Sequence, residues 1–237
     1  MNRPTFDASH LPVPPQQFVL WLDVMGSGKT MARNLLRSAN FVFKLHVAAL
    51  EAKGGNGPRL YPMNDGLYAV AEKYEALVAF AAETFERLSL DLSASGGKAE
   101  HLFLCKGAIA FGHVLEGVQV PAKSSKTLSE NEAHRNSVLL GGCVSWAYRA
   151  EEHAPPFGIY LHESARQGSG KGGVPFTRDP FCRYWTELKP TPKPAWVVGL
   201  AKSVTDYLNY CEAHKHELEY PTDRIKAHRE LAQEFFA

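Results

Sequence analysis

The feature that most constrains this chain is one short stretch near its start, where an apolar run ends in a carboxylate and a glycine-bearing turn. Residues 18–30 read FVLWLDVMGSGKT, so the run leads directly to Asp23, and a helical pattern follows the turn. A buried strand that ends beside a helix start can bind a cation through the acid and an anion through free backbone N–H groups. The stretch therefore predicts a site for a metal and a phosphate at the end of the first strand.

Two other interpretations of this stretch stay open. Gly28-Lys29-Thr30 is similar to the tail of a P-loop, but that motif needs a glycine five positions before Gly28, where this chain has Asp23. A carboxylate there would repel the phosphates unless a metal lay between them, which disfavours a P-loop nucleotide hydrolase. The second alternative gives Asp23 a structural role only, as the cap of the following helix.

Composition excludes several classes of protein. The 237 residues, 45% hydrophobic and 11% aromatic, are enough to bury the core of one large domain. Lys+Arg of 26 against Asp+Glu of 25 argues against a general nucleic-acid or anionic-membrane binder, although a local basic pocket is compatible with it. No signal-peptide core or membrane-spanning run is visible, so we expect a soluble, cytoplasmic protein without a nucleic-acid or membrane partner. The four cysteines form no CxxC pair and are expected to be reduced and mostly buried.

Hydrophobic periodicity and turn residues predict an alternation of strands and helices. Asn64-Asp65-Gly66 between two apolar runs predicts a β-hairpin, and Pro62 places its first arm at a sheet edge or a bulge. The expected elements are a strand at 18–22, a helix at 29–53, the hairpin at 59–70, a helix at 73–92, a strand at 101–111, a return run at 118–120, an exposed loop at 121–134, a helix at 138–152, a strand at 158–161, a flexible segment at 167–173, strands at 183–189 and 196–200, and a helical region at 204–236 broken near Pro221.

The β-α-β-β-α-β order is the ferredoxin-like pattern. We therefore predict an α+β fold with one mixed, mainly antiparallel sheet, helices on one face, and a C-terminal helical extension at 201–237. In this arrangement Asp23 and Asp65 lie at one end of neighbouring central strands. Two carboxylates placed in this way can hold two divalent cations.

Three segments resemble the motifs of class III nucleotidyl cyclases, in the same order. Leu22-Asp-Val-Met-Gly-Ser27 is similar to phenylalanine-x-aspartate-x-x-glycine, and Tyr61-Pro-Met-Asn-Asp-Gly66 is similar to lysine-x-x-glycine-aspartate. Gly141-Gly-Cys-Val-Ser-Trp-Ala-Tyr-Arg149 is similar to glycine-x-x-valine-asparagine-x-alanine-x-arginine. The resemblance covers roughly residues 18–200. It implies a flexible lead-in at 1–16 and a catalytic domain at 17–200.

The resemblance implies a role for each matched residue. Asp23, Val24 and Asp65 would bind two divalent cations, Mg²⁺ or Mn²⁺, and Arg149 would stabilise charge on the α-phosphate. The nucleotide would also contact Tyr61, Ser145, Met25, Gly26, Ser27 and Val138, with Lys29, Arg183 and Lys189 as weaker phosphate candidates. In this family the site spans a homodimer, so Asp23 and Asp65 would come from one protomer and Tyr61 and Arg149 from the other. The alternative for Arg149 is an ordinary helix-surface arginine.

Three departures from the family pattern concern the base. Tyr61 stands at the lysine that reads adenine, Val138 at the aspartate that reads the amino group, and Ser145 at the asparagine that orients the ribose. A tyrosine wall leaves room for a one-ring base. The pattern resembles the pyrimidine cyclases of bacterial Pycsar antiphage systems, which make cyclic UMP or cyclic CMP that acts on a separate effector protein. We favour a uridylate over a cytidylate cyclase, with an ATP or GTP cyclase and a non-catalytic nucleotide-binding dimerisation module as alternatives.

Overall fold

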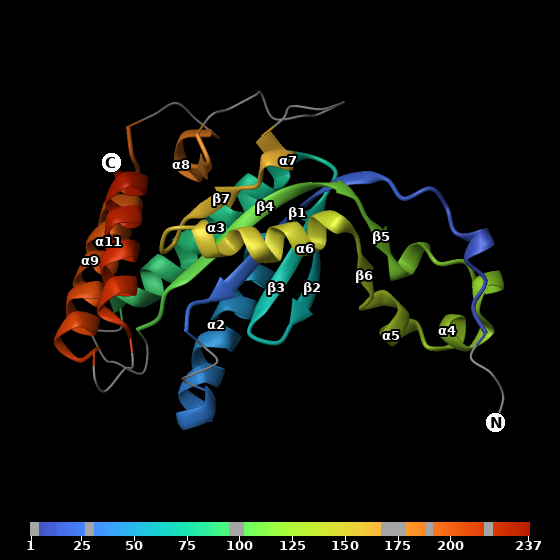
Figure 1. Cartoon of the computed structure of the whole chain (residues 1–237), viewed down its shortest axis with the longest axis horizontal. Coiled ribbons are helices and arrows are strands. Elements are labelled where there is room, and N and C mark those ends of the chain that lie inside the picture. The colour runs from blue at the N-terminus through green and yellow to red at the C-terminus, as the bar shows by residue number, and fades with distance from the viewer. Residues whose placement is uncertain (1–4, 27–30, 95–101, 167–178, 188–191, 216–219) are drawn as a thin grey trace.

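A six-stranded sheet runs through the body of the molecule, with helices on both of its faces (Figure 1). The computed structural model describes residues 5–26, 31–94, 102–166, 179–187, 192–215 and 220–237. Its strands are β1 (Gln16–Val24), β2 (Arg59–Met63), β3 (Gly66–Ala71), β4 (Cys105–His113), β5 (Leu115–Glu116), β6 (Leu139–Leu140), β7 (Ile159–Leu161) and β8 (Phe181–Cys182). Its α-helices are α2 (Leu35–Lys53), α3 (Tyr74–Ala94), α4 (Lys126–Glu130), α5 (Glu132–Asn136), α6 (Gly142–Ala150), α7 (Glu163–Arg166), α8 (Tyr184–Glu187), α9 (Ala195–Ala213) and α11 (Thr222–Phe236).

The strand order is β2-β3-β1-β4-β7-β8, and only the β4–β7 pair is parallel among the described strands. The first four strands with α2 and α3 form the β-α-β-β-α-β unit, which confirms the predicted α+β ferredoxin-like class. β2 lies at the edge of the sheet, where Pro62 is tolerated as predicted. The neighbouring strands β1 and β3 are both central.

Strand β1 is buried on both faces because helices cover both sides of the sheet. Phe18, Leu20 and Leu22 pack into the large core with α2, α3 and α9. Val19 and Trp21 point the other way, into a smaller cluster that includes Cys143 and Ala147 of α6. The core helices α2 and α3 therefore share one face as predicted, and α6 covers the opposite face.

The β2–β3 hairpin turns at Asn64-Asp65, as predicted from its turn residues. Asn64 takes a left-handed backbone conformation (φ 52°), which asparagine tolerates better than most residues. Gly66 is required for a different reason. A Cβ at this position would lie 2.5 Å from the Trp21 indole, which crosses directly over the glycine.

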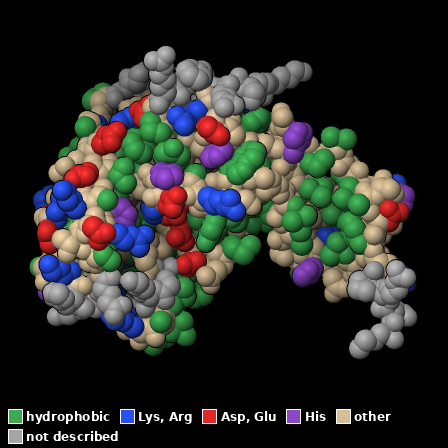
Figure 2. Space-filling view, in the orientation of Figure 1, with side chains coloured by type: hydrophobic (Ala, Val, Ile, Leu, Met, Phe, Trp, Pro, Cys, Tyr) green, Lys and Arg blue, Asp and Glu red, His purple; other side chains and the backbone are tan. Residues whose placement is uncertain are grey.

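An arm projects from the body between β4 and α6 (Figure 1). It contains β5, β6, α4 and α5, together with the 3₁₀ turns Gly117–Gln119 and Ala122–Ser124. The N-terminal segment, with its 3₁₀ turn Ala8–His10, joins it through a hydrogen bond from Asp7 N to Ser124 O of 2.9 Å. In the space-filling view a deep hollow separates the arm from the body, and hydrophobic side chains cover much of the visible face of the arm (Figure 2).

The structure corrects two predictions in the arm. The expected loop at 121–134 instead contains short helices. Local caps allow these helices to begin; Ser125, for example, accepts a hydrogen bond from Leu128 N at the start of α4. The expected helix at 138–152 begins only at Gly142. Residues 139–140 instead form β6, whose backbone pairs with β5.

The C-terminal third departs most from expectation. The predicted strands at 183–189 and 196–200 are wrong, because 184–187 form α8 and Trp196 lies in the first turn of α9. Pro194 precedes α9, and the buried residues of this helix recur at a helical spacing. The helical extension thus begins before residue 201. The break near Pro221 is confirmed, since α9 ends at Ala213 and α11 begins at Thr222; the segment 167–173 lies outside the described residues.

Two further predictions concern cysteines and membrane spans. All four cysteines are buried free thiols, as expected. Within the described ranges no helix combines the length and hydropathy that crossing a bilayer requires.

Candidate functional site

Asp23 lies at the end of β1, half-buried and flanked by a strand on each side. Its register partners are Gly66 of β3 and Lys106 of β4. Burial raises the pKa of the Asp23 carboxyl to about 8, with a further rise from the carboxylates of Glu151 and Asp65 and an opposing effect of Lys106. A positive charge placed beside Asp23 would therefore stabilise the ionised form of its carboxyl.

Lys106 and Glu151 form an ion pair beside Asp23. Lys106 Nζ lies 3.1 Å from Glu151 Oε1 and donates a hydrogen bond of 3.3 Å to the Glu152 carbonyl. Lys106 is only 6% exposed, and Glu151 begins the 3₁₀ turn Glu151–His153 after α6. Burial raises the pKa of the Glu151 carboxyl, against the opposing effect of Lys106. The sequence motifs gave no signal for this pair.

Asp65 lies at the hairpin tip next to Gly66, and Asn64 donates a hydrogen bond of 3.1 Å to its carboxylate. Since Gly66 pairs with Asp23, both aspartates are at the same end of adjacent strands, as predicted. No cluster of three or more His, Cys, Asp or Glu suited to a metal occurs in the part of the chain that the structure describes. The chemistry of the two carboxylates nevertheless fits a divalent cation, because oxygen ligands and net negative charge favour Mg²⁺ or Mn²⁺.

Ser145 and Arg149 lie on the solvent side of α6, both exposed. Arg149 is in the last turn of this helix, two residues before Glu151. The same helix also exposes two aromatic side chains, Trp146 at 43% and Tyr148 at 57%. In this chain the Arg149 side chain is therefore accessible to solvent.

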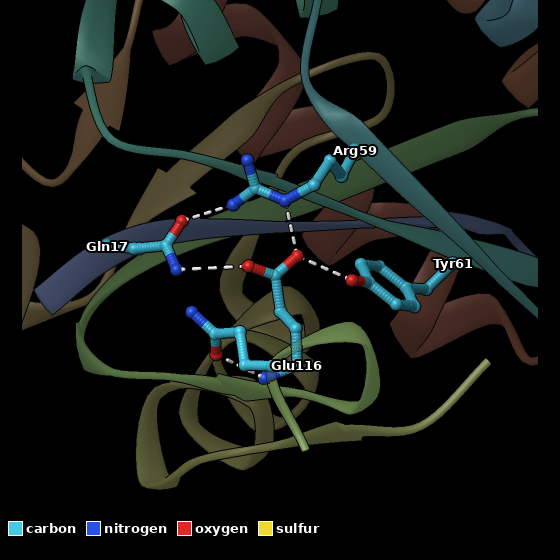
Figure 3. A network of polar contacts seen from close by, with 5 residues as sticks. Gln17, Arg59, Tyr61 and Glu116 are labelled. Atoms are coloured by element: carbon cyan, nitrogen blue, oxygen red, sulfur yellow. Dashed lines mark hydrogen bonds and ion pairs between the residues drawn. The ribbon is translucent and has the colours of Figure 1, made fainter. Parts of the chain in front are cut away.

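Tyr61 is buried at 6% exposure, packed with Trp21 and Tyr68. Its hydroxyl donates a hydrogen bond to the Glu116 carboxylate, which Arg59 and Gln17 also contact (Figure 3). Because its proton is committed to Glu116, the phenol offers a base only an acceptor. A base carbonyl would need a donor, which this hydroxyl does not have to spare.

The Glu116 network anchors the arm. Glu116 is in β5 with 2% exposure, whereas Gln17 is in β1 and Arg59 and Tyr61 are in β2. Burial alone would raise the pKa of the Glu116 carboxyl, but the hydrogen bonds from Arg59, Tyr61 and Gln17 outweigh it, and the pKa lies below its usual range. Arg59 thus has a structural role in this network.

The remaining predicted residues are spread over the molecule. Met25 and Gly26 follow Asp23 directly, with Met25 N donating to Leu104 O at 2.8 Å and Gly26 in a left-handed conformation (φ 74°). Val138 lies in the arm, where its carbonyl accepts from Gly117 N at 2.9 Å. Arg183 contacts Asp179 and the carbonyls of Glu234 and Phe235 at the C-terminal end of α11. Ser27, Lys29 and Lys189 lie outside the described residues.

A cavity of about 300 Å³ opens beside Asp23. Its walls come from the end of β1, the start of α2, the residues before β4, the turn after α6, and helices α9 and α11. The space-filling view shows acidic and basic side chains side by side near the left-hand end of α6, next to the C-terminal helices (Figure 2). Sequence reasoning missed six charged residues of this cavity, the basic Arg33, Arg37, Lys106 and Arg224 and the acidic Glu151 and Glu152.

Comparisons with solved structures return nucleotide cyclases. The guanylyl cyclase Cya2 is 15% identical over 68% of this chain and 82% of that chain, with a TM-score of 0.49. A bacterial light-regulated adenylyl cyclase is 15% identical over 65% and 78%, also with a TM-score of 0.49. The monomeric guanylyl cyclase domain of the RhoGC fusion protein from the aquatic fungus Blastocladiella emersonii is 15% identical over 65% and 84%, with a TM-score of 0.44. No protein-family model and no curated protein matches the chain.

Proposed function

We propose that this chain is a nucleotidyl cyclase that converts a pyrimidine nucleoside triphosphate, UTP or CTP, to a 3′,5′-cyclic nucleotide and pyrophosphate. The observation that carries the proposal is the pairing of Asp23 with Gly66, which brings two carboxylates to one end of adjacent central strands. The burial of Asp23 among other carboxylates supports a positively charged ligand there. A third supporting observation is that Arg149 is exposed on α6.

The chain's own residues would bind and orient the reactants. Asp23, Asp65 and the backbone at Val24 would hold two Mg²⁺ or Mn²⁺ ions, which when bound offset the triphosphate charge and favour ionisation of the ribose 3′-hydroxyl. The 3′-oxygen loses its proton and forms a bond to the α-phosphorus, while the bond to the bridging oxygen breaks and pyrophosphate leaves. Arg149 would stabilise the charge that develops on the α-phosphate.

We propose that the active unit is a homodimer with shared sites. Arg149 and Ser145 point away from their own protomer, and α6 exposes Trp146 and Tyr148 beside them. The arm exposes Val118 at 54%, and burial of such side chains against a second copy would be favourable. In this dimer Asp23 and Asp65 of one protomer would face Arg149 of the partner.

The choice of base would depend on Tyr61. The side chain fills space between Trp21, Tyr68 and Glu116, which supports exclusion of the second ring of a purine. An acceptor-only phenol would bind a base through an N–H, which all four bases present, so the exclusion of purines would rest on the volume of the ring. The cyclic product would then act on a separate effector protein in antiphage defence, as the sequence resemblance implies.

The proposal is tested by incubating the protein with each of the four ribonucleoside triphosphates and Mn²⁺ or Mg²⁺. A cyclic pyrimidine nucleotide with one equivalent of pyrophosphate supports it. A cyclic purine nucleotide would support cyclase activity but overturn the proposed preference for pyrimidine substrates. Release of orthophosphate would indicate the P-loop hydrolase, and no turnover would indicate a nucleotide-binding or dimerisation module.

A further inference from the structure

The cavity beside Asp23 has one wall that the cyclase motifs do not account for. Helices α9 and α11 form this wall, and they pack on each other, with α9 also contacting α3. Tyr207 of α9 and Arg224 and His228 of α11 line the cavity, together with Arg33 and Arg37 around the start of α2. The C-terminal helices thus complete a space that is also lined by Asp23.

Positive charge reaches this cavity from two different helices, α2 and α11. Arg37 is half-buried, with its guanidinium carbon 5.5 Å from the centre of the Phe41 ring, an arrangement that holds the group over an aromatic face. Arg224 is exposed at the first turn of α11 and acts electrostatically on Glu151. Lys106 lies at the inner end, where Glu151 at 3.1 Å balances its charge.

The remaining lining includes a third arginine, Arg33, the carboxylates of Asp23, Glu151 and Glu152, and several apolar and aromatic side chains. The Tyr220 hydroxyl and His228 Nδ1 are hydrogen-bonded to each other. Burial lowers the pKa of the His228 imidazole to about 4, with contributions from Lys106 and Arg224, so this side chain is neutral near pH 7. The positive charge of the lining therefore comes from Arg33, Arg37, Arg224 and Lys106.

We propose that this cavity binds the polyphosphate tail of the nucleotide, with Arg37 of α2 and Arg224 of α11 contacting it. Guanidinium groups present several fixed donors that match phosphate oxygens, which makes arginine well suited to this ligand. Asp23 at the edge of the same cavity places the tail beside the candidate cation ligands. This inference rests on the proposed function and makes the C-terminal helices part of the substrate site.

The test measures binding of inorganic tripolyphosphate with Mg²⁺ by calorimetry. Arg37→Gln and Arg224→Gln should each weaken the affinity about tenfold or more, because each removes charge-assisted hydrogen bonds. Lys226→Gln is the matched control, since Lys226 is exposed on the same helix, pairs with Glu230 at 3.9 Å and does not line the cavity. The control should bind tripolyphosphate like the wild type.

A competition experiment distinguishes a cavity that binds the tail of a nucleoside triphosphate from one that binds only free polyphosphate. A nucleoside triphosphate should displace tripolyphosphate one for one, and Arg224→Gln should raise KM without changing the base preference. Tripolyphosphate binding that nucleotide does not displace, unchanged affinity in Arg37→Gln and Arg224→Gln, or no binding to the wild type would overturn the inference. Tripolyphosphate binding of the expected pattern without any cyclic product would instead overturn the proposed reaction and leave the cavity as a polyphosphate site.

Discussion

Lys106, the register partner of Asp23 on β4, forms a nearly buried ion pair with Glu151, with 3.1 Å between Nζ and Oε1. The pair joins the beginning of β4 to the turn that ends α6. It therefore fixes the helix that carries Arg149 relative to the strand that carries Asp23. The two proposed catalytic segments are thus connected by a charge pair within one protomer.

Removing one partner of this pair should destabilise the protein. Lys106→Met leaves the Glu151 carboxylate buried without its cation, and we expect the free energy of unfolding to fall by about 3 kcal/mol. Urea denaturation measures the effect. Lys202→Met is the control, because Lys202 pairs with Asp206 on the surface of α9 and its loss should change stability by no more than about 0.5 kcal/mol. Equal effects of the two substitutions would contradict a structural role for the buried pair.

The Glu116 network should make the arm sensitive to acid. Glu116→Gln removes a charged acceptor of three hydrogen bonds, and we expect a loss of about 2 kcal/mol in unfolding free energy at pH 7. The folded-state pKa of Glu116 is below its usual value, so its stabilisation is complete above the unfolded pKa and disappears as pH falls through the folded pKa. The difference between wild type and Glu116→Gln, measured by denaturation from pH 7 downwards, should therefore shrink below about pH 4.5. A difference that stays constant over this range would show that Glu116 contributes nothing through its charge.

The hairpin and the first helix pair could be predicted from sequence because their signals are local. Turn residues at Asn64–Gly66 and the apolar run before Asp23 mark their own positions. The run at 196–200 was misassigned because a short apolar segment fits a strand as well as a helix; only its continuation to Cys211 reveals the helical spacing.

The charged part of the site could not be predicted in this way. Lys106, Glu151 and Arg224 are distant in sequence, and only strand pairing and the packing of α11 bring them around one cavity. The partner of the Tyr61 hydroxyl is likewise set by the position of the arm, which carries no local sequence signal.

A shared active site predicts complementation between two inactive variants. Asp65→Asn should lack the cation ligand and Arg149→Ala the group that stabilises the α-phosphate, so each homodimer should be inactive. In a mixed dimer one site carries both changes and the other carries neither. Mixing the two proteins should therefore restore part of the cyclic-nucleotide production. Persistent inactivity, with subunit exchange verified by differently tagged chains, would indicate that each site lies within one protomer.

Base choice should respond to the volume of Tyr61 rather than to its hydroxyl alone. Tyr61→Ala opens the space of a second ring, and the ratio of kcat/KM for pyrimidine over purine substrates should fall by tens-fold, corresponding to about 1–3 kcal/mol. Tyr61→Phe keeps the ring and loses the bond to Glu116, so it should lower stability with a smaller effect on this ratio. The ratios for UTP, CTP, ATP and GTP in all three proteins provide the comparison. If alanine leaves every ratio unchanged, Tyr61 does not select the base.

The most direct test of the central claim measures cyclic-nucleotide formation by wild type, Asp23→Asn and Asp65→Asn with UTP or CTP and Mn²⁺. Asp206→Asn is the control, because Asp206 pairs with Lys202 on the exposed side of α9. The account predicts a cyclic pyrimidine nucleotide and pyrophosphate from wild type and the control, and loss of turnover in Asp23→Asn and Asp65→Asn with the fold retained by circular dichroism. Near-wild-type turnover by either folded aspartate variant would contradict it.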